Sequence, residues 1–198
     1  RPDTAGTPGS PNSSSVDNAG PTFSGLAHLP AVPEDSEPVR VSIAVADPDE
    51  VAEVTLWASV DGAAFEGTSM VEGESGHYSA LLDGQSAGVV VQFYVEASDG
   101  LGGGSTFPAK GADSRALYAV RDSAASATGL HELQIVLTEA DADWMHQDIH
   151  LMSNDRIGAT VVYRGTEVFY DVGVRLKGSQ RCRPTAARVG YGVRFNDD

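Results

Sequence analysis

Between Pro38 and Val120 the chain repeats one pattern, in which short runs of alternating apolar and polar residues end at turn signals. In the first run Val39, Val41, Ile43 and Val45 alternate with smaller or polar residues. A period of two places one set of side chains on a buried face and the other set in water. Asp-Gly pairs and glycine-rich loops separate the runs. About seven such runs in about 85 residues predict an antiparallel β-sandwich over residues 35–121.

The segment before this region has a different composition. Residues 1–22 are almost entirely Pro, Gly, Ser, Thr, Asn and Asp, so they bury too little apolar surface to offset the entropy cost of ordering. We therefore expect residues 1–34 to form a disordered leader. Four apolar residues near its end are candidates to dock on the sandwich: Phe23, Leu26, Leu29 and Val32.

After a small-residue linker at 122–129, residues 130–198 follow a mixed pattern. Residues 130–137 alternate as a strand, and Thr138 followed by acidic residues is typical of a helix N-terminus. Residues 157–163, 168–177 and 189–195 read as further strands. This order predicts an α+β segment with an antiparallel sheet. Because the chain stops directly after a strand-like run, we expect this second domain to be incomplete.

Charge limits the classes of partner. The net charge is −15, yet residues 172–198 contain six basic residues against two acidic ones. An acidic body repels nucleic acid, so we expect no nucleic-acid partner. No run of 18 apolar residues occurs, so we also expect no membrane span. The single cysteine, Cys182, excludes an intrachain disulfide and is interpreted as a loop thiol.

The basic segment contains the candidate binding site. Arg175 and Lys177 occupy positions i and i+2 of a predicted strand, hence one face, and Gly178 follows them. Three more arginines come after this turn: Arg181, Arg183 and Arg188. Guanidinium groups, ammonium groups and backbone N–H groups near a turn suit phosphate oxygens. The alternative interpretation is a solvated basic loop.

The sandwich region resembles the immunoglobulin-like or fibronectin type III-like modules of large bacterial surface proteins. The resemblance rests on DPDEVAEVTLWASVDG, GHYSALL, VVVQFYVEASDGLGG and STFPAKGADSRALYAV within residues 37–120. It implies an exported protein, at the cell surface or extracellular, and a spacer or adhesive role without chemistry.

Residues 130–198 resemble the start of the CotH kinase-like family, the spore-coat protein H type. The run Val174-Arg175-Leu176-Lys177-Gly178-Ser179 matches that family, and Arg188 stands where Lys is common. The resemblance implies the N-terminal lobe of an atypical protein kinase that binds ATP and Mg²⁺ and phosphorylates a protein substrate. It implies cofactor-binding roles for Arg175, Lys177 and Arg188. The magnesium-binding and base residues come later in the family, so we expect no catalytic residue and no catalysis in this chain.

Two interpretations of the parent protein therefore stay open. It is either an exported CotH-like kinase or a surface adhesion protein with a non-catalytic CotH-like unit that contacts other surface proteins. The sequence does not determine the oligomeric state.

Three other groups of residues could each form a further binding site or have a plain structural role. His146 and His150 lie one helical turn apart, but the intervening residues do not form a zinc motif, so a polar surface is favoured. Asp47, Asp49 and Glu50 suit either a calcium site or a Pro-containing turn. Finally, Trp57, Phe65 and Tyr78 would form a carbohydrate platform if they were exposed, although their strand positions favour a core role.

Overall fold

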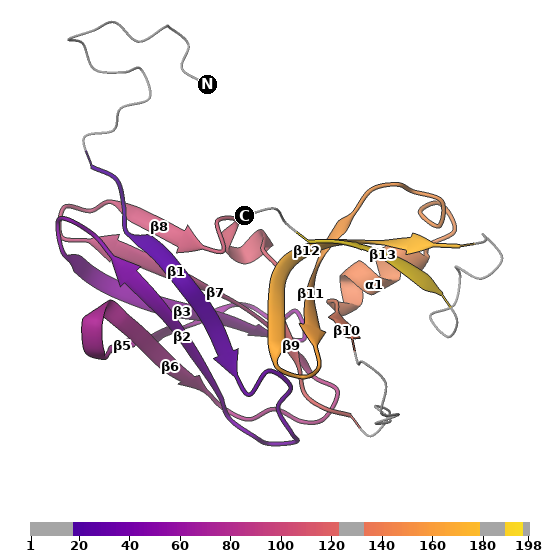
Figure 1. Ribbon diagram of the computed structural model, residues 1–198, viewed down its shortest axis with the longest axis horizontal. Helices are drawn as coiled ribbons and strands as arrows, with labels where there is room; N and C mark the ends of the chain where they lie inside the picture. Colours follow the sequence, from indigo (N-terminus) through magenta and orange to yellow (C-terminus); the bar gives the residue numbers. More distant parts are fainter. Residues whose placement is uncertain (1–17, 123–132, 179–188, 196–198) are drawn as a thin grey trace, which may run out of the picture.

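The computed structural model describes residues 18–122, 133–178 and 189–195. The described chain is mostly β, and its strands form three antiparallel sheets (Figure 1). Two of the sheets make up one half of the molecule and the third makes up the other half. No helix among the described residues is long and apolar enough to cross a membrane.

The first half is the predicted β-sandwich. One sheet has the order β1-β2-β6-β5, and the other has the order β4-β3-β7-β8 with β9 paired to β7. The strand bounds are β1 Thr22–Leu29, β2 Val39–Ala46, β3 Val51–Val60, β4 Glu66–Ser69, β5 Val71–Glu72, β6 His77–Leu82, β7 Val90–Asp99, β8 Gly104–Phe107 and β9 Ala116–Ala119. Two short 3-10 helices, η1 Glu74–Gly76 and η2 Gly111–Asp113, connect them.

Alternation sets the core of the sandwich as the sequence predicts. Val39, Val41, Ile43 and Val45 of β2 are all at most 3% exposed. They belong to the same apolar cluster as the inward residues of β3 and β7. The buried members contributed by β3 and β7 are Val54, Leu56, Val91, Phe93, Val95 and Ala97.

The expected leader is wrong over residues 22–29, because these residues form β1. Phe23 pairs with Val45 on β2, and both Phe23 and Leu26 pack against the sandwich core. Leu29, in contrast, is 64% exposed. The register of β1 shifts beside Gly25, which has a φ of 66° that favours glycine. Residues 1–17, the rest of the expected leader, lie outside the described residues.

The second half is a four-stranded sheet with one helix, and we call this sheet the second sheet. Its order is β10-β11-β12-β13, and its strands are Leu133–Val136, Ile157–Tyr163, Glu167–Lys177 and Gly190–Arg194. Helix α1, Glu139–His146, begins as predicted, since the Thr138 hydroxyl accepts a hydrogen bond from the Asp141 N–H at 3.1 Å. Nearly all of the expected linker, 122–129, lies outside the described residues.

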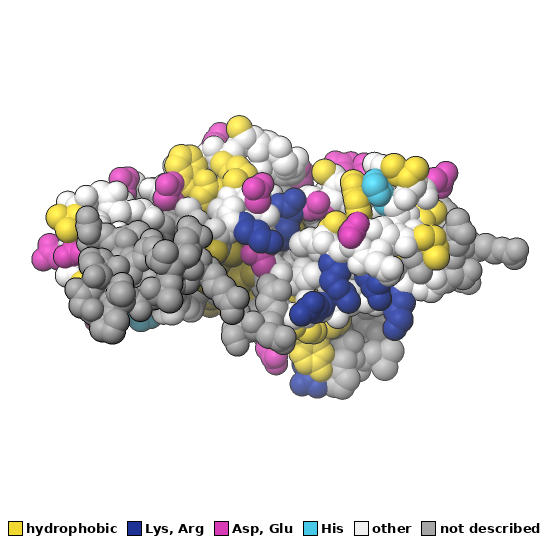
Figure 2. Space-filling view, turned by 90° about the horizontal axis from the view of Figure 1, so that it is seen from above, with side chains coloured by type: hydrophobic (Ala, Val, Ile, Leu, Met, Phe, Trp, Pro, Cys, Tyr) yellow, Lys and Arg dark blue, Asp and Glu magenta, His cyan; other side chains and the backbone are white. Residues whose placement is uncertain are grey.

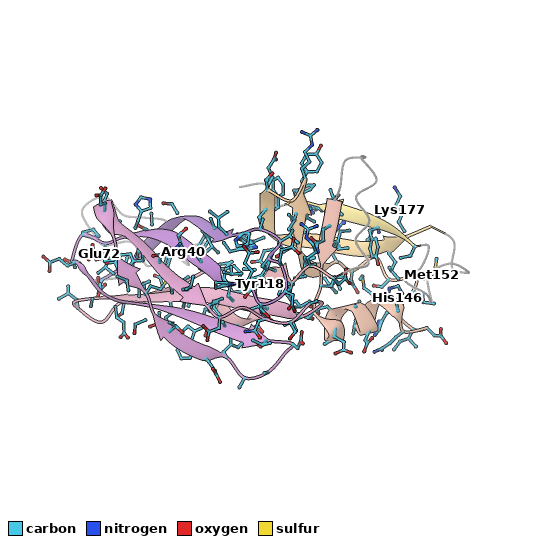
Figure 3. All side chains as sticks on the ribbon, turned by 90° about the horizontal axis from the view of Figure 1, so that it is seen from below. Arg40, Glu72, Tyr118, His146, Met152 and Lys177 are labelled. Carbon is cyan, nitrogen blue, oxygen red and sulfur yellow. The ribbon has the colours of Figure 1, made fainter. Side chains whose placement is uncertain are left out.

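Helix α1 covers one face of this sheet. Met145 of the helix and Leu151 after it pack against Leu176 of β12. Lys177, the next residue of β12, is exposed and points to the side of the sheet away from the helix that carries His146 (Figure 3). The two faces of β12 therefore differ, one being apolar and covered and the other bearing cations.

A bulge in β12 joins the two halves. Tyr170 and Asp171 lie where the pairing register between β11 and β12 shifts, beside Thr160, and Asp171 has a φ of 52°. The Tyr170 ring packs against the sandwich core, and its hydroxyl lies 2.6 Å from Nδ1 of His28. Because Nε2 of His28 lies 3.1 Å from the carbonyl oxygen of Ala31, Nε2 carries the proton and Nδ1 accepts from Tyr170.

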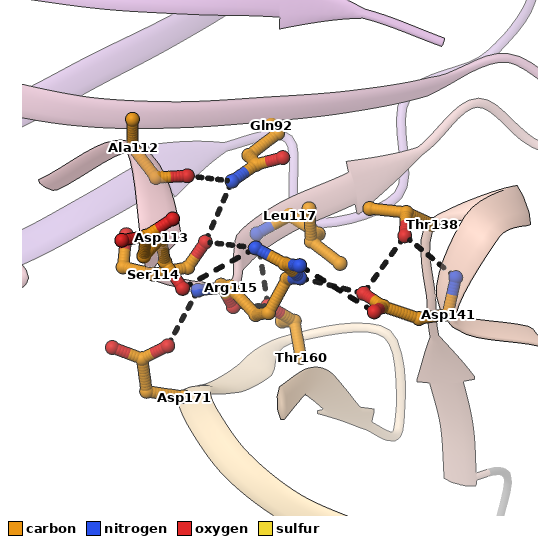
Figure 4. A network of polar contacts seen from close by, with 10 residues as sticks. All are labelled: Gln92, Ala112, Asp113, Ser114, Arg115, Leu117, Thr138, Asp141, Thr160 and Asp171. Carbon is orange, nitrogen blue, oxygen red and sulfur yellow. Dashed lines mark hydrogen bonds and ion pairs between the residues drawn. The ribbon is translucent and has the colours of Figure 1, made fainter. Parts of the chain in front are cut away.

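Polar contacts surround the bulge (Figure 4). The Thr160 hydroxyl donates to the Arg115 carbonyl at 2.6 Å and accepts from the Leu117 N–H at 2.9 Å. Asp171 accepts a hydrogen bond from the Arg115 N–H. The Arg115 guanidinium pairs with Asp141 at 2.6 Å. The backbone around residue 115, just before β9, is thus bound by side chains of the second sheet.

Candidate anion-binding face

The cations of the second sheet gather on the face opposite α1. Arg175 and Lys177 alternate with the buried Val174 and Leu176, so both cations project from the same face of β12. On β13, Arg194 is paired with Gly173, which places Arg194 on this face as well. Figure 2 shows the Lys and Arg side chains grouped over this half of the molecule.

Glycines form the floor of this face. Gly173, Gly190 and Gly192 are the partners of Arg194, Lys177 and Arg175 across the β12–β13 ladder. A Cβ atom at Gly173 would lie 3.1 Å from Cδ of Arg156, and one at Gly192 would lie 3.6 Å from Cγ of Arg175. Because these glycines have no side chain, the side chains of Arg156 and Arg175 can lie close against the sheet.

Arg156 completes the set. It precedes β11, and its Nη1 donates to the carbonyl oxygen of Gly192 at 3.1 Å. We call the four residues Arg156, Arg175, Lys177 and Arg194 the cation face. Ion pairs between described residues join Arg115 to Asp141 and Arg121 to Glu34, so none neutralises the cation face. Arg175 donates a hydrogen bond to the neutral amide oxygen of Asn154, which orients it without removing its charge.

A groove of about 610 Å³ runs from the cation face to the sandwich. Arg156 and Arg194 line it from the sheet, and Lys110 lines it from the loop before η2. Its two carboxylates are Asp113 and Asp171, and Asp171 accepts the Arg115 N–H. With these three cations against two carboxylates, the groove carries a net positive charge and suits an anion with several oxygens.

The structure brings together two of the three predicted site residues. Arg175 and Lys177 share the cation face, whereas Arg188, like Arg181 and Arg183, lies outside the described residues. Sequence reasoning missed Arg156, because it lies before a strand and far along the chain from Arg175. The sequence held one sign of this face, the glycines at 173, 190 and 192. Each of them is paired with a cation across the β12–β13 ladder.

The other predicted constellations have plain structural environments. The His150 ring stacks on Trp144 with ring centres 3.9 Å apart. Asp47 accepts the Asp49 N–H at 2.7 Å and so shapes the turn after β2. Within the described ranges, no group of three His, Cys, Asp or Glu side chains is placed to hold a metal ion.

Comparison with known proteins identifies no family for this chain. No family model and no curated protein matches it. One solved structure with partial similarity is titled "Crystal structure of Br derivative BhCBM56". It is 20% identical, with a TM-score of 0.29, over 35% of this chain and 71% of that chain. Similarity this slight supports no conclusion about fold or function.

Proposed function

We propose that the cation face binds the phosphate groups of a nucleotide. The observation that carries the proposal is the convergence of four cations, unpaired with any described carboxylate, on a floor of glycine backbone. Guanidinium groups match phosphate oxygens in pairs, and ammonium groups add a compact charge. The CotH-like resemblance of residues 130–198 supports ATP as the nucleotide and an exported kinase as the parent protein.

The described residues fit the phosphates of ATP better than they fit its metal. The phosphates require cations, which the face supplies, whereas Mg²⁺ requires carboxylate or water oxygens. No described cluster of carboxylates meets that need. Phosphoryl transfer also requires metal-binding acids and a base that positions the nucleophile. In the CotH-like family those groups follow the segment that this chain resembles, so the present residues bind and orient the nucleotide only.

Nucleotide binding by the whole chain tests the proposal. Isothermal titration of ATP should give saturable binding, and Arg175→Ala combined with Lys177→Ala should weaken it by at least about tenfold, since each removes a charge-assisted contact. Arg40→Ala is the matched control, because Arg40 is an exposed arginine on β2, where it faces Ser79. Equal affinities for ATP in all three proteins would overturn the proposal.

A second candidate is a surface adhesion protein with a non-catalytic CotH-like unit. It is favoured by the way the second sheet is docked on the sandwich through Tyr170 and Thr160, which makes one continuous body. Assays of the longer parent protein separate the two candidates. ATP-dependent phosphorylation of a protein substrate favours the kinase, and nucleotide binding without transfer favours the adhesion protein.

A further inference from the structure

An aromatic cluster lies on the outer face of the β4-β3-β7-β8 sheet. Inward residues of β3 and β7 such as Leu56 and Phe93 fill the sandwich core, so Trp57 and Tyr94, one residue further on, point outward. Phe65 packs edge-on against Tyr94 with ring centres 5.2 Å apart. We call Trp57, Phe65 and Tyr94 the aromatic face. Tyr78, in contrast, is buried in the core, as its strand position favoured, so it takes no part in the aromatic face.

Two rings of the aromatic face, those of Trp57 and Tyr94, share an orientation. Trp57 and Tyr94 are cross-strand partners whose ring planes lie within 14° of parallel, with centres 6.3 Å apart. Each ring is only partly buried, so part of each faces solvent. The two rings expose apolar surface in an otherwise polar layer of Thr, Ser, Gln and Glu side chains.

Two contacts hold the indole across the strands. Its Nε1 donates to Glu96 on β7 at 2.8 Å, at an exposed position. Its opposite edge lies over Gly67 on β4, where a Cβ atom would come within 3.1 Å of Cζ3. Glycine weakens a strand, and its presence often marks a close approach. Gly67 thus gives the indole the space in which to extend from β4 to β7.

Charge restricts what this surface accepts. Strands β3, β4, β7 and β8 contain no Lys, Arg or His, whereas Glu53 and Glu96 lie on the outer face. An anionic polymer would therefore be repelled. An uncharged sugar ring presents C–H groups that pack on the negative face of an aromatic ring, and hydroxyl groups that donate to a carboxylate. Glu96, already beside the indole, is placed to accept from such a hydroxyl.

We propose that the aromatic face binds a neutral glycan. The sugar rings stack on Trp57 and Tyr94, and Phe65 supports Tyr94 from the side. Glu96 accepts a hydrogen bond from a sugar hydroxyl. The proposal is independent of nucleotide binding, because the aromatic face belongs to the sandwich and the cation face to the second sheet.

Affinity electrophoresis of the whole chain tests the proposal. Gels containing hydroxyethyl cellulose, a soluble β-1,3-glucan or mannan should retard the protein in at least one case, whereas polygalacturonate should not. Trp57→Ala and Tyr94→Ala should each weaken retardation by at least about tenfold, a loss typical of removing one aromatic anchor. Phe169→Ala is the matched control, because Phe169 is an exposed aromatic residue on β12 of the other sheet.

Two further variants keep the test independent of folding defects. Gly67→Val keeps every aromatic residue but displaces the indole, so it should weaken retardation as Trp57→Ala does. Glu96→Gln keeps an oxygen that accepts the indole N–H but loses the second carboxylate oxygen, so it should weaken retardation by about threefold to tenfold, less than the loss of a ring does. Circular dichroism confirms that each variant is folded. Absence of retardation in every neutral gel, retardation unchanged by Trp57→Ala and Tyr94→Ala, or a preference for polygalacturonate would each overturn the proposal.

Discussion

The two halves of the molecule acquire a core in different ways. The sandwich closes two sheets over one another, and its cluster unites sixteen buried residues from both sheets among those described. The second sheet has one helix on one face and cations on the other, and over its described residues, 133–178 and 189–195, its two buried clusters hold four and three residues. It compensates by inserting Tyr170 into the sandwich core and by binding the backbone beside β9. We therefore expect the sandwich to be stable by itself and the second sheet to depend on it.

The largest expected effect comes from removing the docked ring. Tyr170→Ala should lower the free energy of unfolding by about 3–5 kcal/mol, because it removes a partly buried aromatic ring from the sandwich core and leaves the buried Nδ1 of His28 without its hydrogen-bond donor. Urea titration measures the change. Phe169→Ala, its exposed neighbour, is the control and should cost less than about 1 kcal/mol. A small effect at Tyr170 would mean that the second sheet does not rely on the sandwich.

Acid should weaken the same contact through His28. Burial lowers the pKa of His28 from 6.5 to about 4, partly opposed by the hydrogen bond to Ala31. The unfolded chain therefore binds a proton more readily than the folded chain does, so this contribution is full above pH 6.5 and is lost progressively down to about pH 4. The loss should total about 3 kcal/mol.

Urea titrations at several pH values check this window. His28→Gln removes the titrating group, so the free energy of unfolding of this variant should vary less between pH 6.5 and 4 than that of the natural protein. The same slope in both proteins would show that His28 is not the source.

A smaller effect is expected from the buried hydroxyl at the junction. Thr160→Val keeps the shape but leaves the Leu117 N–H without its acceptor. The free energy of unfolding should fall by about 1–3 kcal/mol. Thr166→Val, in the exposed turn between β11 and β12, is the control and should be nearly neutral. Equal stability of the two variants would show that the Thr160 hydroxyl does not stabilise the junction.

The smallest effect is expected at the ion pair. Arg115 and Asp141 are partly exposed, so Asp141→Asn should cost no more than about 1 kcal/mol. The loss should shrink further in high salt, because salt screens the pair that the variant lacks. A large, salt-independent loss would indicate that Asp141 acts through the N-terminus of α1, where it accepts the Thr138 hydroxyl at 2.8 Å.

Much of the fold follows from local pattern, and the exceptions have physical reasons. Alternation predicted the inward residues of β2, and Thr138 marked the start of α1. Strand β1 was missed because it combines small and polar residues with a bulge at Gly25. The parity of Val54 and Leu56 already places Trp57 outward, so its predicted core role contradicted its own strand.

The junction and part of the cation face were beyond local reasoning. Tyr170 and His28 are 142 positions apart. A bulge with a positive φ at Asp171 turns β12 so that Tyr170 reaches His28. No periodicity encodes such a pairing. Likewise, Arg156 reaches the cation face only because β11 and β12 pair in a register that places it beside Gly173.

Hydrogen exchange, measured peptide by peptide, tests the dependence of one half on the other most directly. In the natural protein, amides of β2, β3 and β7 should exchange more slowly than those of β11 and β12. Tyr170→Ala should speed exchange in β11 and β12 while leaving β2, β3 and β7 nearly unchanged. Equal acceleration in both halves, or none in β11 and β12, would contradict the account.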